Sequence, residues 1–311
     1  MGFVSSQKKF MRVLVAGATG LIGRPLVQAL LNRGDEVYYL TTDKNKCQTI
    51  AGATGFYWEP EKYKYPEKAL VGVSVVINLA GASVSLPWTK KRKQQILKSR
   101  LNTAKTLEQA IASQAIRPKQ YISASGISGY ASAQALKYKD QDEILGKSFL
   151  AEVVRKWEAA VVPFEDLDIK TTRVRTGLVL AKTGGVLPQI VSPVRLGLGS
   201  VIGTGLQHIS WIHMDDLVAI YLWIIDNQKT NSINAVAPYP VTHQEMMQII
   251  AKTLRRPLWL PKVPAWLLRI ILGERSDLVL DSQWVIPEIL TREKFKFKYS
   301  KLEAALSDLL L

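Results

Sequence analysis

The sequence is poor in the residues that build disulfide frameworks and metal sites. Its 311 residues include one cysteine, Cys47, and three histidines, at positions 208, 213 and 243. A single cysteine excludes an internal disulfide and a cysteine-rich metal cluster. So few histidines also argue against a zinc site, because cysteine and histidine are the usual zinc ligands. We therefore expect a protein that holds no metal ion.

Long hydrophobic runs are missing as well. The longest ones, residues 217–225 and 263–272, fall short of the ~20 apolar residues that a membrane-spanning helix needs. Residues 1–10 contain two lysines and no acidic residue, but they lack the apolar core of a secretory signal. We predict a flexible N-terminal extension over residues 1–10, no membrane span and a cytoplasmic location, with organelle targeting left open.

Acidic residues are outnumbered by basic ones. The chain has 41 lysines and arginines against 26 aspartates and glutamates, a net charge of +15, which favours anionic ligands or surfaces. The basic residues are scattered, however, and the dense cluster at residues 90–93 has no interleaved aromatic residues to stack on bases. We predict a small-molecule ligand rather than nucleic acid, and a monomer or homodimer. An RNA- or membrane-associated role would rest on net charge alone.

The most informative stretch is residues 13–23, where an apolar β-type run leads into three glycines spaced three apart. Gly17 permits a tight turn, Gly20 lets the backbone approach a pyrophosphate, and Gly23 lets the following helix pack close to the strand. The start of that helix offers unpaired N–H groups to phosphates. A turn without a ligand is the alternative, but the strand before and the helix after favour dinucleotide binding. The predicted contacts are Gly17, Thr19, Gly20, Leu21, Ile22 and Gly23.

Strand-like and helix-like segments alternate along the first part of the chain. After the first strand, β-type runs are found at residues 37–40, 55–58, 73–79, 120–125 and 170–175. Helical patterns are found at residues 21–33, 89–113 and 148–161. This alternation is typical of an α/β protein with a Rossmann-type, doubly wound parallel sheet.

The pattern loosens after residue 182, where glycines and prolines become frequent. The expected elements are helices at 216–226 and 243–254, a helical segment ending at 272, an extended stretch at 295–299 and a short last helix. We predict an NAD(P)-binding domain over residues 11–182 and a smaller C-terminal substrate lobe over residues 183–311. Whether later strands rejoin the sheet stays open.

Further motifs carry a resemblance to a known family. They include residues 78–81 (Asn-Leu-Ala-Gly), 175–180, 195–199, 203–205 and 211–216. From Arg12 onward the chain resembles the extended and atypical short-chain dehydrogenases/reductases. More narrowly, it resembles the epimerase-family proteins that end in a domain of unknown function, DUF1731. The resemblance implies a Rossmann domain that binds NADP(H), a substrate lobe and a DUF1731-like segment at residues 262–309, but no particular reaction.

The end of the predicted second strand bears on the choice of cofactor. NAD-preferring sites usually place Asp or Glu there to bind the ribose hydroxyls, whereas this chain reads Leu40-Thr41-Thr42-Asp43-Lys44. Thr41 stands where the acid is expected, and Thr42 stands where the resemblance implies an arginine for a 2′-phosphate. Because no acid stands at the strand end and the chain is basic, we predict NADP, with NAD as the alternative.

Other cofactor contacts are expected at the ends of later strands. Small residues after the fourth strand would let the cofactor lie against the strand end. The resemblance adds an arginine on the long helix and residues after the sixth strand. The predicted set outside the glycine turn is Thr41, Thr42, Lys44, Leu79, Ala80, Gly81, Arg100, Thr176 and Leu178.

The proton-transfer pair of the superfamily is absent. In its classical members, a lysine four residues after a tyrosine lowers the tyrosine pKa so that the hydroxyl can move a proton. The matching positions here hold Leu145 and Phe149. By resemblance, Ser125 matches the superfamily serine and Tyr130 matches one of two family tyrosines, so these two are the candidate catalytic residues. A packed aromatic on the pocket wall is the alternative for Tyr130.

Three more polar residues have simpler explanations than catalysis. His213 titrates near neutral pH, but a histidine satisfied by hydrogen bonds beside the strand is favoured. Asp215 and Asp216 precede an apolar helical run, so helix capping explains them better.

Two hypotheses of function follow from these residues. The first is an NADP(H)-dependent oxidoreductase or epimerase that acts on a small sugar-like or carbonyl substrate. The second is a catalytically silent dinucleotide-binding protein that senses the cofactor or binds a partner, which the missing tyrosine–lysine pair supports.

Overall fold

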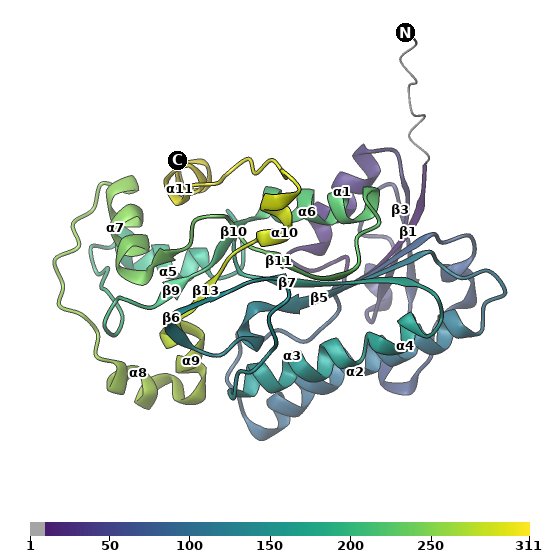
Figure 1. Cartoon of the computed structure of the whole chain (residues 1–311), viewed down its shortest axis with the longest axis horizontal. Coiled ribbons are helices and arrows are strands. Elements are labelled where there is room, and N and C mark those ends of the chain that lie inside the picture. The colour runs from purple at the N-terminus through teal and green to yellow at the C-terminus, as the bar shows by residue number, and fades with distance from the viewer. Residues whose placement is uncertain (1–9) are drawn as a thin grey trace, which may run out of the picture.

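A parallel sheet of seven strands forms the centre of the molecule (Figure 1). The computed structural model describes residues 10–311, and the predicted extension at residues 1–10 lies outside them except for Phe10. The sheet order is β11-β7-β5-β4-β1-β2-β3, and every neighbouring pair is parallel. The strands are β1 (Arg12–Ala16), β2 (Glu36–Thr41), β3 (Ala53–Tyr57), β4 (Val75–Asn78), β5 (Gln120–Gly126), β7 (Lys170–Thr176) and β11 (Asn231–Ala235). The predicted α/β class with a doubly wound parallel sheet is confirmed.

Helices cover both faces of this sheet (Figure 1). In β1, Val13 and Val15 face one apolar core while Leu14 and Ala16 face the other, because successive side chains of a strand point to opposite sides. The first core is closed by α1 (Gly23–Asn32) and α6 (Met214–Asp226). The second face carries α2 (Lys90–Ala112), α3 (Phe149–Ala159) and α4 (Val162–Glu165).

A smaller lobe lies beside the carboxyl ends of the strands. Its core joins Trp211 to apolar side chains of α5 (Leu187–Arg195), α7 (His243–Thr253) and α11 (Leu302–Leu310). Two short strand pairs border it, β8 (Leu178–Leu180) with β10 (Trp211–His213) and β9 (His208–Ile209) with β12 (Val241–Thr242). α8 (Ala265–Leu272) and α9 (Asp277–Leu280) lie at its outer edge, at the lower left of Figure 1.

The sheet layer and the lobe exchange segments. β11 and the preceding α6 return to the sheet after residue 182, which the predicted boundary leaves open. In the other direction, β6 (Ala133–Tyr138) leaves the first half of the chain and pairs in parallel with β13 (Gln283–Val285). α10 (Glu288–Arg292) then packs two apolar residues into the core under α1 and α6. These long-range contacts tie the lobe to the sheet.

The start of α6 differs from the prediction. The N-cap residue is His213, whose Nδ1 accepts the N–H of Asp215 at 3.0 Å. Asp216 accepts the backbone N–H groups of Lys298 (2.7 Å) and Tyr299 (2.9 Å), and Asp215 pairs with the Lys298 ammonium at 2.8 Å. The expectation that the two aspartates cap the helix is therefore wrong. They fasten the extended segment before α11 to the sheet layer.

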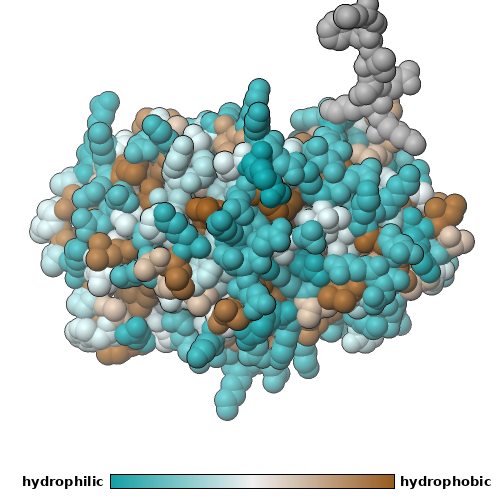
Figure 2. All heavy atoms as spheres, in the orientation of Figure 1, coloured by the Kyte–Doolittle hydropathy of each residue, from teal (hydrophilic) through white to brown (hydrophobic). Residues whose placement is uncertain are grey.

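The outer surface on the face drawn in Figure 2 is mostly hydrophilic, with hydrophobic residues scattered in small groups. Within residues 10–311, no helix is long and apolar enough to cross a membrane. In the same range, no three His, Cys, Asp or Glu side chains are grouped to hold a metal ion.

Candidate functional site

The turn between β1 and α1 brings backbone close to backbone. Gly17 has a φ of +84°, and a Cβ at this residue would lie 2.8 Å from the carbonyl carbon of Leu79. A Cβ at Gly23 would lie 2.2 Å from the oxygen of Gly17, so glycine lets α1 pack this closely on β1. α1 begins at Gly23 with no side-chain cap and no acidic residue in its first turn. Arg24 donates its N–H to the Gly20 oxygen at 3.2 Å, and Pro25 has no N–H. The N–H groups of Ile22 and Gly23 are therefore the ones available to an anion.

Two cavities meet at this turn. The first, which we call the outer cavity, has a volume of about 590 Å3 and lies beside the ends of β2 and β3. The second, the lobe cavity, has a volume of about 620 Å3 and lies between the sheet and the lobe. Both are lined by Gly17, Gly20, Leu79 and Gly81. They form a cleft at the point where the strand order reverses, between β1 and β4, which is where open α/β sheets bind ligands.

The structure brings nearly all the predicted cofactor contacts to this cleft. Those in the outer cavity are Gly17, Thr19, Gly20, Thr41, Thr42, Leu79, Ala80 and Gly81. Those added by the lobe cavity are Leu21, Ile22, Gly23, Arg100, Thr176 and Leu178. Lys44 lines neither cavity, but its Nζ lies 5.1 Å from the ring centroid of Tyr57, which lines the outer one.

The outer cavity beside the end of β2 is lined by Lys62 and by two glutamates, Glu59 and Glu61. Asp43 caps the short 3-10 turn that follows, because its Oδ1 accepts the N–H of Asn45 at 3.0 Å. Lys62 lines the outer cavity and pairs with Glu59 at 2.6 Å. Lys62, followed by Lys64 and Lys44, holds the pKa of the Glu59 carboxyl below its ordinary value. The acid that ordinarily binds ribose hydroxyls at this strand end is thus missing.

Arg100 is a half-buried cation with no acidic partner. Its Nη1 donates to the carbonyl oxygens of Ala82 (3.1 Å) and Ile96 (2.9 Å), and its Nε has no hydrogen-bond partner. The guanidinium carbon lies 4.7 Å from the ring centroid of Trp157. Burial, aided by the charge of Arg92, lowers the pKa of Arg100 to about 10. Because buried charges are normally paired, this side chain favours an anionic group in the cleft.

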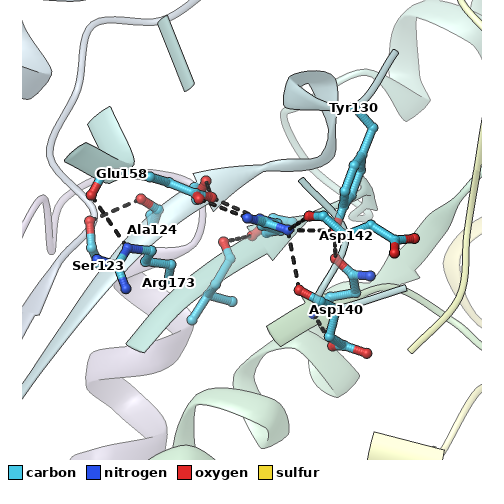
Figure 3. Close-up of polar contacts among 12 residues, drawn as sticks. Ser123, Ala124, Tyr130, Asp140, Asp142, Glu158 and Arg173 are labelled. Atoms are coloured by element: carbon cyan, nitrogen blue, oxygen red, sulfur yellow. Dashed lines mark hydrogen bonds and ion pairs between the residues drawn. The ribbon is translucent and has the colours of Figure 1, made fainter. Parts of the chain in front are cut away.

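Tyr130 belongs to a buried network behind the cleft (Figure 3). The residue is 1% exposed and lines neither cavity. Its hydroxyl lies 2.9 Å from both the Lys139 carbonyl oxygen and Asn234 Oδ1, and accepts from Arg175 Nη1 at 2.7 Å. Arg175 also pairs with Glu158 at 2.9 Å. Burial raises the pKa of Tyr130 to about 12. The hydroxyl is not placed to give a proton to a ligand in the cleft.

Ser125 does line the lobe cavity, but its hydroxyl donates to Glu158 Oε1 at 2.6 Å. The neighbouring helix α3 is the one that carries the tyrosine–lysine pair in the superfamily. Its residues in the lobe cavity are Leu150, Val153, Val154 and Trp157. None of these side chains ionises, so the ordinary proton-transfer machinery is missing from the structure as well as from the sequence.

Sequence reasoning misses three ionisable residues of the lobe cavity, namely His208, His243 and Asp281. Burial lowers the pKa of both histidines, that of His243 to about 4, and raises the pKa of Asp281. These residues come from β9, from α7 and from the segment between α9 and β13. Because only the folded chain brings them together, no local spacing marks them as a group.

Comparison with known proteins agrees with this architecture. The epimerase family protein YfhF of Bacillus subtilis is 33% identical over 301 residues, which cover 96% of this chain and 98% of that protein. The crystal structure of the human epimerase family protein SDR39U1 (isoform 2) with NADPH has a TM-score of 0.84 at 29% identity, covering 96% of this chain and 99% of that one. The nucleoside-diphosphate sugar epimerase from Corynebacterium glutamicum has a TM-score of 0.79 at 30% identity, covering 97% of this chain and 58% of that one.

Two family profiles account for most of the chain. The profile of a domain of unknown function, DUF1731, matches residues 263–309, at the place that the motifs predict. The profile of the NAD dependent epimerase/dehydratase family matches residues 13–237, from the first strand of the sheet to the end of β11. The chain therefore belongs to the NAD dependent epimerase/dehydratase family, as a member that ends in a DUF1731 domain.

Proposed function

We propose that this protein binds NADP(H) and acts as an oxidoreductase or epimerase on a small organic substrate in the lobe cavity. The observation that carries the proposal is the two-part cleft that meets at the uncapped glycine turn. The turn would hold the pyrophosphate, the outer cavity the adenosine, and the part of the lobe cavity near Thr176 and Leu178 the nicotinamide. A bound nicotinamide supplies hydride transfer, and the rest of the lobe cavity leaves room for the substrate.

The charges around the cleft support NADP over NAD. Asp43 is engaged as a cap, so no carboxylate at the end of β2 is free to bind ribose hydroxyls. Lys44 follows that end and would attract a 2′-phosphate, whereas Lys62 in the neighbouring turn is paired with Glu59. Among the relatives, the human protein was crystallised with NADPH.

A paired titration with NADPH and NADH, followed by cofactor fluorescence, tests this proposal. We expect NADPH to bind at least about tenfold more tightly than NADH, a difference of about 1.4 kcal/mol. Lys44→Ala should weaken NADPH binding and leave NADH binding unchanged. Lys46→Ala is the matched control, because Lys46 lies in the same short turn and pairs with Asp43. Equal affinities would contradict the choice of NADP, and binding of neither cofactor would contradict the proposal as a whole.

A catalytically silent dinucleotide-binding protein is the second candidate. Two observations favour it: α3 presents no ionisable side chain to the lobe cavity, and the Tyr130 hydroxyl is committed to a buried network. Incubation of the NADPH-loaded protein with a panel of small aldehydes and ketones separates the two candidates. Consumption of NADPH would support the enzyme, whereas tight NADPH binding without any consumption would support the silent protein.

A further inference from the structure

The far side of the lobe cavity has an apolar wall. Beyond the residues proposed for the nicotinamide, the cavity is lined by Val186, Ile190, Ile202, Ile209, Leu278 and Val279. The four α3 residues that line the cavity are apolar too. Such a wall contrasts with the mostly hydrophilic outer surface in Figure 2. This wall would desolvate the part of a ligand that lies on it without replacing lost hydrogen bonds. Apart from Arg100 and Thr176, the polar residues of the cavity are Ser83, Ser125, Ser128, Ser210, His208, His243, Asp281 and Gln283.

The lobe cavity also lacks cations where a second diphosphate would have to lie. Among the described residues that line it, Arg100 is the sole lysine or arginine. Arg100 lies against the β4 end of the cleft, because its guanidinium carbon would be 3.0 Å from a Cβ on Gly81. That position belongs to the proposed cofactor. On the lobe side, burial keeps His208 and His243 neutral at pH 7 by lowering their pKa values, and Asp281 adds a carboxyl.

Three residues that line the lobe cavity, Arg100, Trp157 and His208, each have a buried nitrogen without a hydrogen-bond partner. The Nδ1 of His208 is buried and has no hydrogen-bond partner. The His208 ring is held in place by stacking on Trp284, with 4.3 Å between ring centroids. A buried polar atom without a partner is costly, so it is commonly satisfied by a ligand or water. The His208 ring lines the lobe cavity, but this nitrogen is closed off from the open space of the cavity.

We propose that the substrate of the lobe cavity is a small, largely apolar carbonyl compound or the corresponding alcohol, and not a nucleoside-diphosphate sugar. This inference rests on the proposed function, since it assigns the other part of the cleft to NADP(H). It separates this chain from the sugar-nucleotide chemistry named for the Corynebacterium glutamicum protein. The apolar wall takes the body of the molecule, and neutral polar side chains that line the same cavity, such as Ser128 and Gln283, take its oxygen.

Calorimetric titration of the full chain with two probes tests the proposal. The probes are 2-octanone and UDP-glucose, each added to protein saturated with NADP+, which cannot deliver a hydride to the ketone. We expect 2-octanone to bind at least about tenfold more tightly than UDP-glucose, with the negative heat-capacity change of apolar burial. A smaller preference, a preference for UDP-glucose, or no binding of the ketone would overturn the proposal.

A pair of variants locates the probe. Leu278 is 41% exposed and lines the lobe cavity, whereas Leu206 is 55% exposed and lines neither cavity. Leu278→Asp should weaken 2-octanone binding at least about tenfold, and Leu206→Asp should leave it unchanged. Unchanged ketone binding in Leu278→Asp would overturn the placement.

A titration with NADPH alone keeps this proposal distinct from the proposed function. If NADPH binds but UDP-glucose is preferred to the ketone, the substrate class is wrong and the cofactor proposal stands. If NADPH does not bind, the cofactor proposal fails. The two probes are then compared on the cofactor-free protein. This comparison still tests the substrate class, because the lobe cavity is lined by residues of the chain itself.

Discussion

Gly20 gives the sharpest test of the cleft, because it separates binding from folding. The residue is exposed at the turn and lines both cavities. A Cβ at Gly20 would meet the Gly17 oxygen at 3.2 Å, a contact that a small shift relieves, and its φ is not in the left-handed region. A larger side chain at Gly20 would therefore project into the cleft while the surrounding structure stays folded.

The expected loss of affinity follows from the contacts that a phosphate makes with backbone N–H groups. Each hydrogen bond to a charged group contributes about 1.5–3 kcal/mol, so losing one corresponds to roughly a 10- to 150-fold rise in Kd. We expect Gly20→Leu to weaken NADPH binding by at least this factor. Its free energy of unfolding should change by less than about 1 kcal/mol, as for other exposed substitutions.

Gly23→Ala is the contrasting variant. Its added Cβ would lie 2.2 Å from the Gly17 oxygen and 2.6 Å from the Ala18 Cα, both backbone atoms. The variant should therefore lose about 1–3 kcal/mol of stability through overpacking. Fluorescence titration with NADPH and urea unfolding on the same samples provide the two measurements. A Gly20→Leu protein that binds NADPH as tightly as the parent would refute the assignment of this turn to the pyrophosphate.

Three further predictions concern the buried polar groups. Tyr130→Phe removes the hydroxyl that Arg175 donates to, so urea unfolding should show a loss of about 1–3 kcal/mol with NADPH affinity unchanged; weaker NADPH binding at parental stability would contradict this. Glu158→Gln leaves Arg175 buried without its carboxylate and should cost more, about 3–5 kcal/mol; a variant as stable as the parent would show that the ion pair is dispensable. Burial lowers the pKa of His243 from 6.5 to about 4. Between these two pH values His243 is protonated in the unfolded chain but neutral in the folded chain. The free energy of unfolding should therefore fall as the pH drops from 6.5 towards 4. The expected loss is at most about 3 kcal/mol, and the pH dependence of urea unfolding should flatten in His243→Gln; an identical slope in both proteins would contradict the assignment.

The parts of the fold that the sequence predicts are those set by local physics. The glycine turn is one, because its three positions are fixed by backbone contacts within a single strand–turn–helix unit. Thr89 is another: its hydroxyl accepts the N–H of Arg92 at 3.1 Å and starts α2 at the expected place. Apolar runs such as β4 are buried on both faces and are equally easy to recognise.

The parts that escape prediction depend on partners far away in the chain. β6 pairs with β13, in a register that sets Ala133 beside Gln283. The sequence of neither segment indicates that the other is its pairing partner. The same reason explains Tyr130, whose position after β5 matches one of the two tyrosines that the family resemblance implies there. Its hydroxyl is turned away from the cleft by Arg175 and Asn234, which lie on β7 and β11. Side-chain direction at such a position is decided by the assembled core rather than by the local sequence.

The absence of the superfamily lysine from α3 and the presence of Arg100 without an acidic partner are explained by the same electrostatics. In the superfamily, a lysine on the helix corresponding to α3 supplies a cation beside the reacting groups. Here α3 lines the lobe cavity with apolar residues, and Trp157 on that helix packs against the guanidinium of Arg100, which comes from α2. Arg100 already has a lowered pKa and no counter-charge. A second buried cation on α3 would repel it and would itself be desolvated. The electrostatics of the cleft thus favour a single cation there, Arg100, and the α3 wall of the lobe cavity is apolar.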